Sequence, residues 1–225
     1  LWRALGVRLA AKPAPVGGMG ASPYVVSQDY NPHLKLELPA EFVFIDSSLE
    51  ARDAKEAPPG FNQQERITSG LQEVLFPFPG GLVREGGAEV TFEPLVRTAA
   101  PRTGTIEVEQ VMNNRGDMRQ LRVFERRADE SLVLAVAVER KTPAPPAATE
   151  QPAAEPAAPS PTVRAVVVAD IDLLDGRIFG LRSRPDEVFG LDFDNVEFAL
   201  NVLDELDRKS TRLNSSHANI SYAVF

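Results

Sequence analysis

Two aliphatic segments separated by a Pro/Ala-rich stretch constrain the fold of this chain more than any other feature. The segments are LVLAVAV at 132–138 and AVVVA at 165–169. Continuous runs of β-branched and aliphatic residues are typical of strands buried on both faces, as in an α/β sheet. Both runs are far shorter than the roughly 20 residues of a membrane-spanning helix. They therefore predict two interior strands of an α/β domain.

The stretch between these segments, residues 142–162, consists mostly of Pro, Ala and Glu. Such a composition buries too little apolar surface to fold, so we predict a disordered or extended insert. The segment from Val163 to Leu206 has only about 44 residues, close to the size below which chains seldom fold alone. We therefore predict one partial domain over 1–206 that carries the insert as a long loop.

Local patterns predict further elements. EFVFIDSS indicates a strand over Phe42 to Ile45, and AEVTFEPLVRTA indicates a strand with Pro94 near an edge. In ERITSGLQEVLFPFPGGLV, the spacing predicts a helix that Pro77 and Pro79 end. Four apolar residues share one face of it: Ile67, Leu71, Val74 and Leu75.

DNVEFALNVLDEL predicts a second helix, which Asp194 or Asn195 caps. Its apolar stripe follows the i, i+3, i+4, i+7 spacing: Ala199, Val202, Leu203 and Leu206.

The last segment, 207–225, differs from everything before it. One reading frame of a common sequencing-library adapter encodes Asp207 to His217, a six-base index would encode Ala218 and Asn219, and the adapter resumes from Ile220 to Phe225. We therefore interpret this tail as non-native. Its apolar residues share no face with the stripe of the preceding helix, so we expect a trailing loop or opportunistic helix with few buried contacts. Because the chain begins with Leu1, we also interpret it as a fragment of a longer reading frame.

Composition excludes several kinds of site. The formal net charge of −8 disfavours binding to nucleic acid, because an acidic chain repels phosphate backbones. The chain has no Cys, which excludes thiolate metal sites and cysteine nucleophiles. Neither G-x-S-x-G nor GxxxxGK[ST] is present. His33, the only histidine before the tail, is interpreted as a surface residue. We therefore predict no catalytic residue, cofactor site or metal site.

A few polar residues remain as candidates for contact with a ligand. Asp170, Asp172 and Asp175 follow a predicted buried strand, and ligands usually bind at that edge of an α/β sheet. Alternating carboxylates could hold a divalent metal, although capping of turns and exposure to water explain them more simply. Asn195, in the sequence DFDN, could approach the same edge, although helix capping also explains it. The ligand-facing candidates are Asp170, Asp172 and Asn195.

Three segments together resemble one family: ERITSGLQEVLFPFPGGL, VVVADIDLLDGRIF and FDNVEFALNVLDEL. The chain is similar to the GldG-like auxiliary components of ABC transport systems, which are associated with gliding motility in bacteria. The resemblance implies an incomplete Rossmann-like domain of the class I glutamine-amidotransferase-like type. It also implies a location at the bacterial cytoplasmic membrane, with the soluble domain outside the cytoplasm and the membrane anchor in segments missing from this fragment.

The function implied by the resemblance is that of a non-enzymatic transport auxiliary, whose partners are an ABC permease and an ATPase subunit. Two alternatives stay open at this point. One is an enzyme of the amidotransferase-like class whose active site lies in the missing N-terminal part. The other is a glycan- or peptide-binding module at the Asp170–Asp172 edge.

Overall fold

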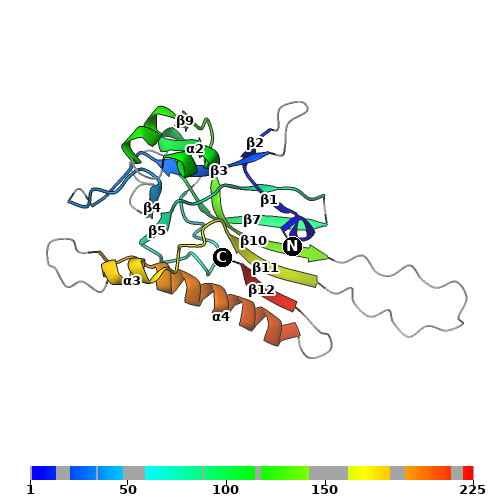
Figure 1. Cartoon of the computed structure of the whole chain (residues 1–225). Coiled ribbons are helices and arrows are strands. Elements are labelled where there is room, and N and C mark those ends of the chain that lie inside the picture. Colours follow the sequence, from blue (N-terminus) through cyan, green and yellow to red (C-terminus); the bar gives the residue numbers. More distant parts are fainter. Residues whose placement is uncertain are drawn as a thin grey trace, which may run out of the picture.

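The computed structural model describes residues 2–13, 21–33, 35–47, 59–87, 89–114, 118–141, 162–182, 191–213 and 220–224. The predicted insert lies outside this set, except for its last residue, Thr162, which begins a strand. The described elements build one large mixed sheet, a second sheet and a two-stranded pair, and α4 (Asn195–Leu213) packs against the large sheet and the two-stranded pair (Figure 1).

The two aliphatic segments form the centre of the large sheet. They are β10 (Val133–Lys141) and β11 (Thr162–Val168), which pair antiparallel from Ala135 opposite Val168 to Lys141 opposite Thr162. Successive side chains enter two different cores: Ala135 and Val166 enter one, and Val136 and Val167 enter the other. The prediction of two strands buried on both faces, flanking the insert, is therefore confirmed.

The other strands of this sheet lie on both sides of that central pair. Along the edge of β10 that faces away from β11, β7 (Val90–Arg97) pairs antiparallel with β10, and Pro94 stands opposite Val136. The short strands β6 (Leu82–Arg84) and β1 (Val7–Leu9) continue the sheet from the start of β10. The strand predicted around Pro94 is thus confirmed.

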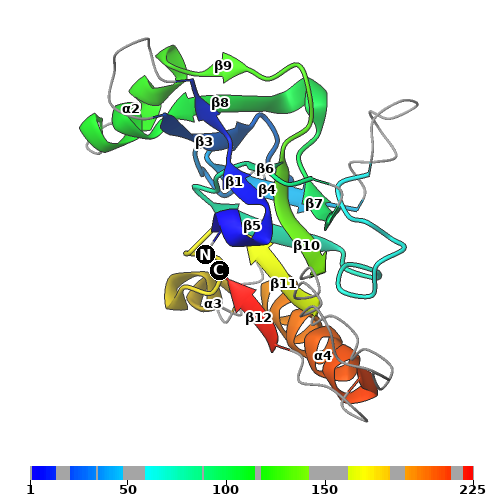
Figure 2. The same ribbon diagram turned by 90° about the vertical axis from the view of Figure 1, so that its right-hand side faces the viewer.

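A second sheet lies beside the first, at the end of the molecule opposite α4 (Figure 2). Its strands, in sheet order, are β2 (Ala11–Lys12), β3 (Ser22–Gln28), β8 (Thr103–Glu107) and β9 (Arg126–Arg127). Three short helices accompany it: η2 (Ala100–Arg102), α2 (Val108–Asn113) and η3 (Met118–Val123). The remaining pair is β4 (Phe42–Asp46) with β5 (Glu73–Pro77), which confirms the strand predicted at Phe42 to Ile45.

The helix predicted over Ile67 to Leu75 is wrong. Residues 63–70 form turns, Gly70 adopts φ 90°, and the chain then runs as β5. Val74 pairs with Ile45, and Leu75 pairs with Phe44, so consecutive apolar residues face opposite sides of the strand pair. A short apolar run fits a helix or a buried strand by spacing alone, and here pairing with β4 decides between them.

The helix predicted after Asp194 is confirmed as α4, but its apolar stripe differs from the prediction. Phe198 and Val202 are fully buried, and Ala199 and Leu206 are buried beside them. Leu203 is 55% exposed. Three of the four predicted stripe residues are therefore buried, and Phe198 takes the place of Leu203, because the core contacts the helix along the 198–202–206 line.

This difference gives a testable pair of substitutions. We expect Val202→Ala to lower the free energy of unfolding by about 2 kcal/mol, because it removes buried methyl groups and leaves a cavity. Leu203→Ala, its neighbour on α4, should change it by less than about 0.5 kcal/mol, as exposed positions do. Urea unfolding of both variants measures the difference, and equal losses would contradict the observed orientation of α4.

The segment interpreted as a non-native tail does not simply trail. α4 continues through Leu213, and β12 (Ile220–Val224) pairs parallel with β11, from Val163 opposite Ile220 to Val167 opposite Val224. The expectation of a loop or helix with few contacts is therefore wrong for residues 220–224. The physical reason is that the outer edge of β11 carries backbone donors and acceptors that any extended segment can satisfy. The origin of the tail in adapter DNA stays a prediction.

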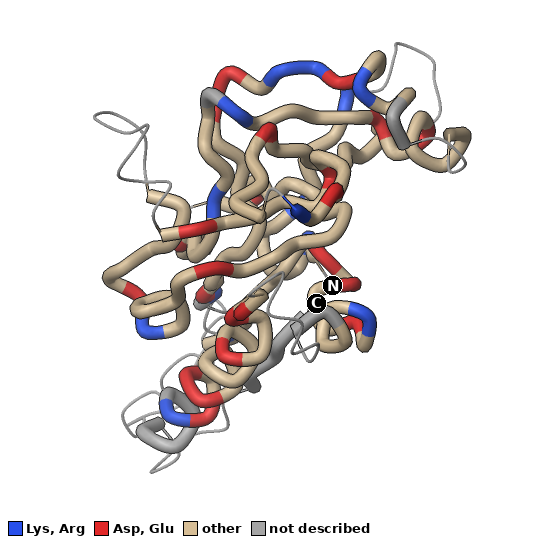
Figure 3. Tube along the Cα trace, turned by 90° about the vertical axis from the view of Figure 1, so that its left-hand side faces the viewer, with Lys and Arg blue, Asp and Glu red and all other residues tan. Residues whose placement is uncertain are grey.

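Charged residues of both signs are interspersed along the described trace, and acidic residues recur along α4 (Figure 3). This distribution follows the composition, in which acidic residues outnumber basic ones.

Candidate functional site

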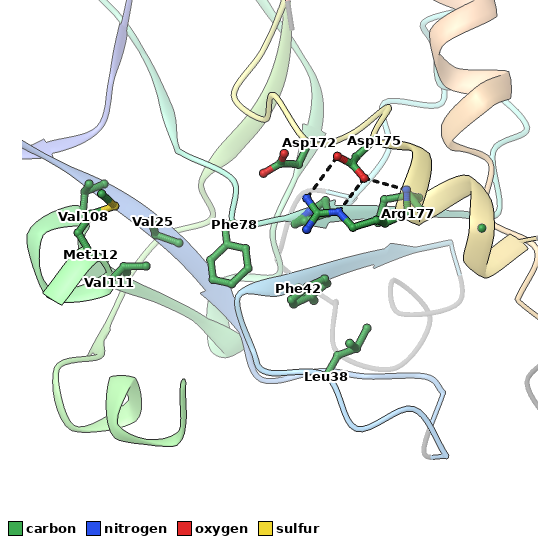
Figure 4. Close-up of a pocket in the computed structure, with 13 residues that line it drawn as sticks. Val25, Leu38, Phe42, Phe78, Val108, Val111, Met112, Asp172, Asp175 and Arg177 are labelled. Atoms are coloured by element: carbon green, nitrogen blue, oxygen red, sulfur yellow. Dashed lines mark hydrogen bonds and ion pairs between the residues drawn. The ribbon is translucent and has the colours of Figure 1, made fainter. Parts of the chain in front are cut away.

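A cleft of about 1010 Å³ opens between the loop after β11 and the second sheet. Its described lining comes from β3, from the β4–β5 pair with Leu38 before it and the turn after it, from α2, from the loop after β11, and from α3 (Gly176–Arg182). Figure 4 shows these parts converging on one space. The cleft is thus assembled from segments that are distant in the sequence.

The walls of the cleft are almost entirely apolar. Val25 of β3 and Phe42 of β4 form one part, and α2 adds a second part through Val108, Val111 and Met112 (Figure 4). The aromatic ring of Phe78 lies between these parts and meets the ring of Phe42 edge-on, with centroids 5.3 Å apart. The apolar surface thus runs continuously from α2 to β4.

Phe78 is held in the cleft by an unusual backbone conformation. Its φ is 53°, in the left-handed region that non-glycine residues seldom adopt. Its backbone N–H donates to the Glu41 carbonyl at 2.7 Å, and two neighbours anchor the same turn. The Pro79 carbonyl accepts from Val26, and the Gly80 N–H donates to Ala169. The turn after β5 therefore ties both sheets together and points an aromatic ring into the cleft.

The polar part of the cleft lies where β11 ends. Asp172, Asp175 and Arg177 line it. The Arg177 guanidinium donates to both Asp175 oxygens, with Nε–Oδ1 at 2.8 Å and Nη2–Oδ2 at 3.2 Å. These hydrogen bonds lower the pKa of Asp175 below its usual value. Two carboxylates and one guanidinium leave this rim with a net negative charge.

Asp170 does not line the cleft but lies beneath its rim. Its side chain is 5% exposed, and Oδ1 accepts the backbone N–H of Asp172 at 2.8 Å. Oδ2 has no hydrogen-bond partner in the described part of the chain. Burial in an apolar surrounding raises the pKa of Asp170 to about 7, because the charged form loses its hydration.

Asn195 also lies away from the cleft. Its amide bridges two segments: Oδ1 accepts the Leu75 N–H at 3.1 Å, and Nδ2 donates to the carbonyls of Leu75 and Leu173 at 2.8 and 3.0 Å. Its neighbour Asp194 accepts backbone N–H groups of Gln72 and Glu73 through Oδ2. These side-chain hydrogen bonds of Asn195 and Asp194 thus tie the start of α4 to β5.

The structure therefore separates the three ligand-facing candidates. Asp172 faces the cleft, Asp170 lies in the interior two residues before it, and Asn195 joins β5 to the loop after β11. Among the described residues, no group of three or more His, Asp or Glu side chains is arranged to hold a metal ion.

His33 is the polar residue that sequence reasoning misjudged. Its side chain is only 16% exposed, its Nε2 lies 2.7 Å from Glu73 Oε1, and its ring contacts Phe44 and Phe193. Burial raises the pKa of Glu73, and the hydrogen bond with His33 opposes that rise. The expectation of a surface histidine is thus wrong. Asn31 Oδ1 accepts the His33 N–H, a local turn that the sequence YNPH could have indicated.

We compared the chain with known proteins, and one family model matches it. No curated protein and no solved structure matches the chain. Within the described residues, no helix has both the length and the apolar character needed to cross a bilayer. A family model described as "ABC-type uncharacterized transport system" matches residues 22–202, which extend from the start of β3 into α4. Because this match covers most of the chain, including the described residues that line the cleft, the chain belongs to that family of ABC transport auxiliary proteins.

Proposed function

We propose that this domain is a non-enzymatic auxiliary subunit that contacts the permease of an ABC transporter on the extracytoplasmic side of the bacterial membrane. The family match over residues 22–202 carries the proposal, because membership assigns the chain to a transport system. A GldG-like role associated with gliding motility, with an ATPase subunit completing the assembly, belongs to the same proposal.

The environment of the ionisable side chains supports a non-catalytic role. A general base needs access to substrate, whereas the ring of His33 is paired with Glu73 and packed against two phenylalanines. The cleft itself presents apolar walls and one acidic rim. Such a surface suits recognition more than proton transfer.

We also propose that this domain is related to the Rossmann-like folds of the amidotransferase-like type. The support is the buried strand β11, the acidic edge after it and the helix α4 that packs on the sheet. In such folds, ligands bind outside the carboxyl ends of strands, which is where Asp172 stands.

Co-purification tests the partnership. A tagged full-length protein, expressed in its own membrane, should retain a permease and an ATPase subunit through gentle solubilisation. An unrelated tagged domain with the same anchor serves as the control. If the tagged protein retains no transporter subunit beyond the control, the proposed partnership is wrong.

The absence of cysteine from the chain allows a clean test of orientation. Val123→Cys places a thiol at an exposed position of η3. We expect a membrane-impermeant maleimide to label this variant in intact spheroplasts as fully as in permeabilised ones. Labelling that requires permeabilisation would place the domain in the cytoplasm instead.

A binding module is the second candidate function, and the cleft is the observation that favours it. If the Asp170–Asp172 edge recognised glycan or peptide through calcium, calcium should raise the melting temperature of the intact domain. A melting temperature that calcium leaves unchanged would remove the calcium-dependent version of this candidate.

A further inference from the structure

The cleft is large enough for a ligand of its own. Its volume of about 1010 Å³ stands at the upper end of the range for small-molecule sites, which is roughly 300–1,000 Å³. Val108, Val111 and Met112 of α2 supply an apolar wall, although Met112 is 50% exposed. Binding of an apolar ligand to such a wall removes apolar surface from water, which makes binding favourable.

The polar end of the cleft determines which ligand fits. Asp175 is neutralised by the two-point contact with Arg177. The Arg177 guanidinium forms its ion pair with Asp175 and interacts with Asp172 only at longer range. Among the described residues, no cationic nitrogen forms an ion pair with the Asp172 carboxylate within 4 Å. One negative charge is therefore left at the edge of an apolar space, facing the cleft (Figure 4). A carboxylate in such a position attracts a cationic group and repels an anionic one.

We propose that this cleft binds a small amphiphile with an apolar body and an ammonium group. The body lies along α2, Phe78 and Phe42, and the ammonium group lies at Asp172. This site goes beyond the transport role and does not require a permease. A failed co-purification would therefore not contradict the amphiphile site, and a failure to bind the amphiphile would not contradict the partnership with a permease.

Calorimetric titration of the purified chain with two probes of equal chain length tests the proposal. We expect n-decyltrimethylammonium, below its micelle concentration, to bind saturably at one site. We expect n-decyl sulfate to bind at least about tenfold more weakly, because its charge meets Asp172. Equal affinities for the two probes, or saturable binding of neither, would overturn the proposal.

Two matched pairs of variants locate the site. Asp172→Asn should weaken ammonium binding on the order of fivefold, whereas Asp204→Asn, an exposed aspartate on α4, should leave it unchanged. Met112→Gln should weaken both probes about threefold or more, whereas Leu200→Gln should not. Met112 and Leu200 are 50% and 59% exposed, so neither change threatens folding. If Asp172→Asn binds the ammonium probe like Asp204→Asn, or Met112→Gln binds the probes like Leu200→Gln, the ligand does not lie in this cleft.

Discussion

Replacement of Asn195 by aspartate is expected to destabilise the domain by about 3–5 kcal/mol at pH 8. The side chain is 1% exposed, and its amide nitrogen donates to the carbonyls of Leu75 and Leu173. Aspartate keeps the acceptor for the Leu75 N–H but sets a charged oxygen against two carbonyl oxygens. Both the buried charge and the two carbonyls without donors lower stability.

Urea unfolding at pH 8 measures this loss, and Asn201→Asp on the same helix is the control. The Asn201 amide donates one hydrogen bond, to the Ile67 carbonyl at 3.2 Å, and its side chain is partly exposed, so its loss should cost only about 1 kcal/mol. The deficit of the Asn195→Asp variant should shrink as pH falls, because a protonated carboxyl can donate to one of the carbonyls. Equal, pH-independent losses in both variants would show that the Asn195 bridge adds nothing beyond one ordinary hydrogen bond.

Asp170 should make the domain less stable as pH rises, by up to about 4 kcal/mol. Its folded pKa of about 7 lies above the ordinary aspartate value of 3.8, mainly because burial removes hydration from the carboxylate. Folding therefore favours the protonated form. This contribution is fully present below pH 4, declines as the pH rises toward 7, and is gone above it. Asp170→Asn keeps the shape without the charge, so its stability should depend less on pH.

The measurement is the free energy of urea unfolding of both proteins between pH 4 and pH 8. Burial also raises the pKa values of Glu41 and Glu73, so both proteins lose some stability in the same direction. The difference between the two curves isolates Asp170. Asp175→Asn is a control of opposite sign, because Arg177 lowers the pKa of Asp175, and the contribution of that pair is lost as pH falls. Parallel curves for wild type and Asp170→Asn would mean that Asp170 is ionised in the fold at no cost.

Patterns of neighbouring residues were sufficient to predict the strands that consist of continuous aliphatic residues. LVLAVAV and AVVVA have continuous aliphatic composition, and the strands β10 and β11 bury alternate side chains in two cores. The same reasoning failed at Ile67 to Leu75, where the spacing fits a helical face but β4 supplies strand pairing. It also assigned Leu203 wrongly to the buried face of α4. The spacing of apolar residues shows that a helix has a buried face, but the contact with the sheet decides which residues lie at its margin.

The amino-acid sequence alone specifies the aliphatic segments, the acidic composition and the resemblance to a transport family, since each of these depends on residues close together in the chain or on overall content. The cleft required the folded chain. Val25, Phe78, Met112 and Asp172 come from four separate segments, and only the packing of two sheets places them around one space. The same packing put Asp172 at the rim and Asp170 in the interior, because the chain turns immediately after β11. Residues two apart in sequence therefore acquire different hydration, and hydration determines which of the two carboxylates can meet a ligand.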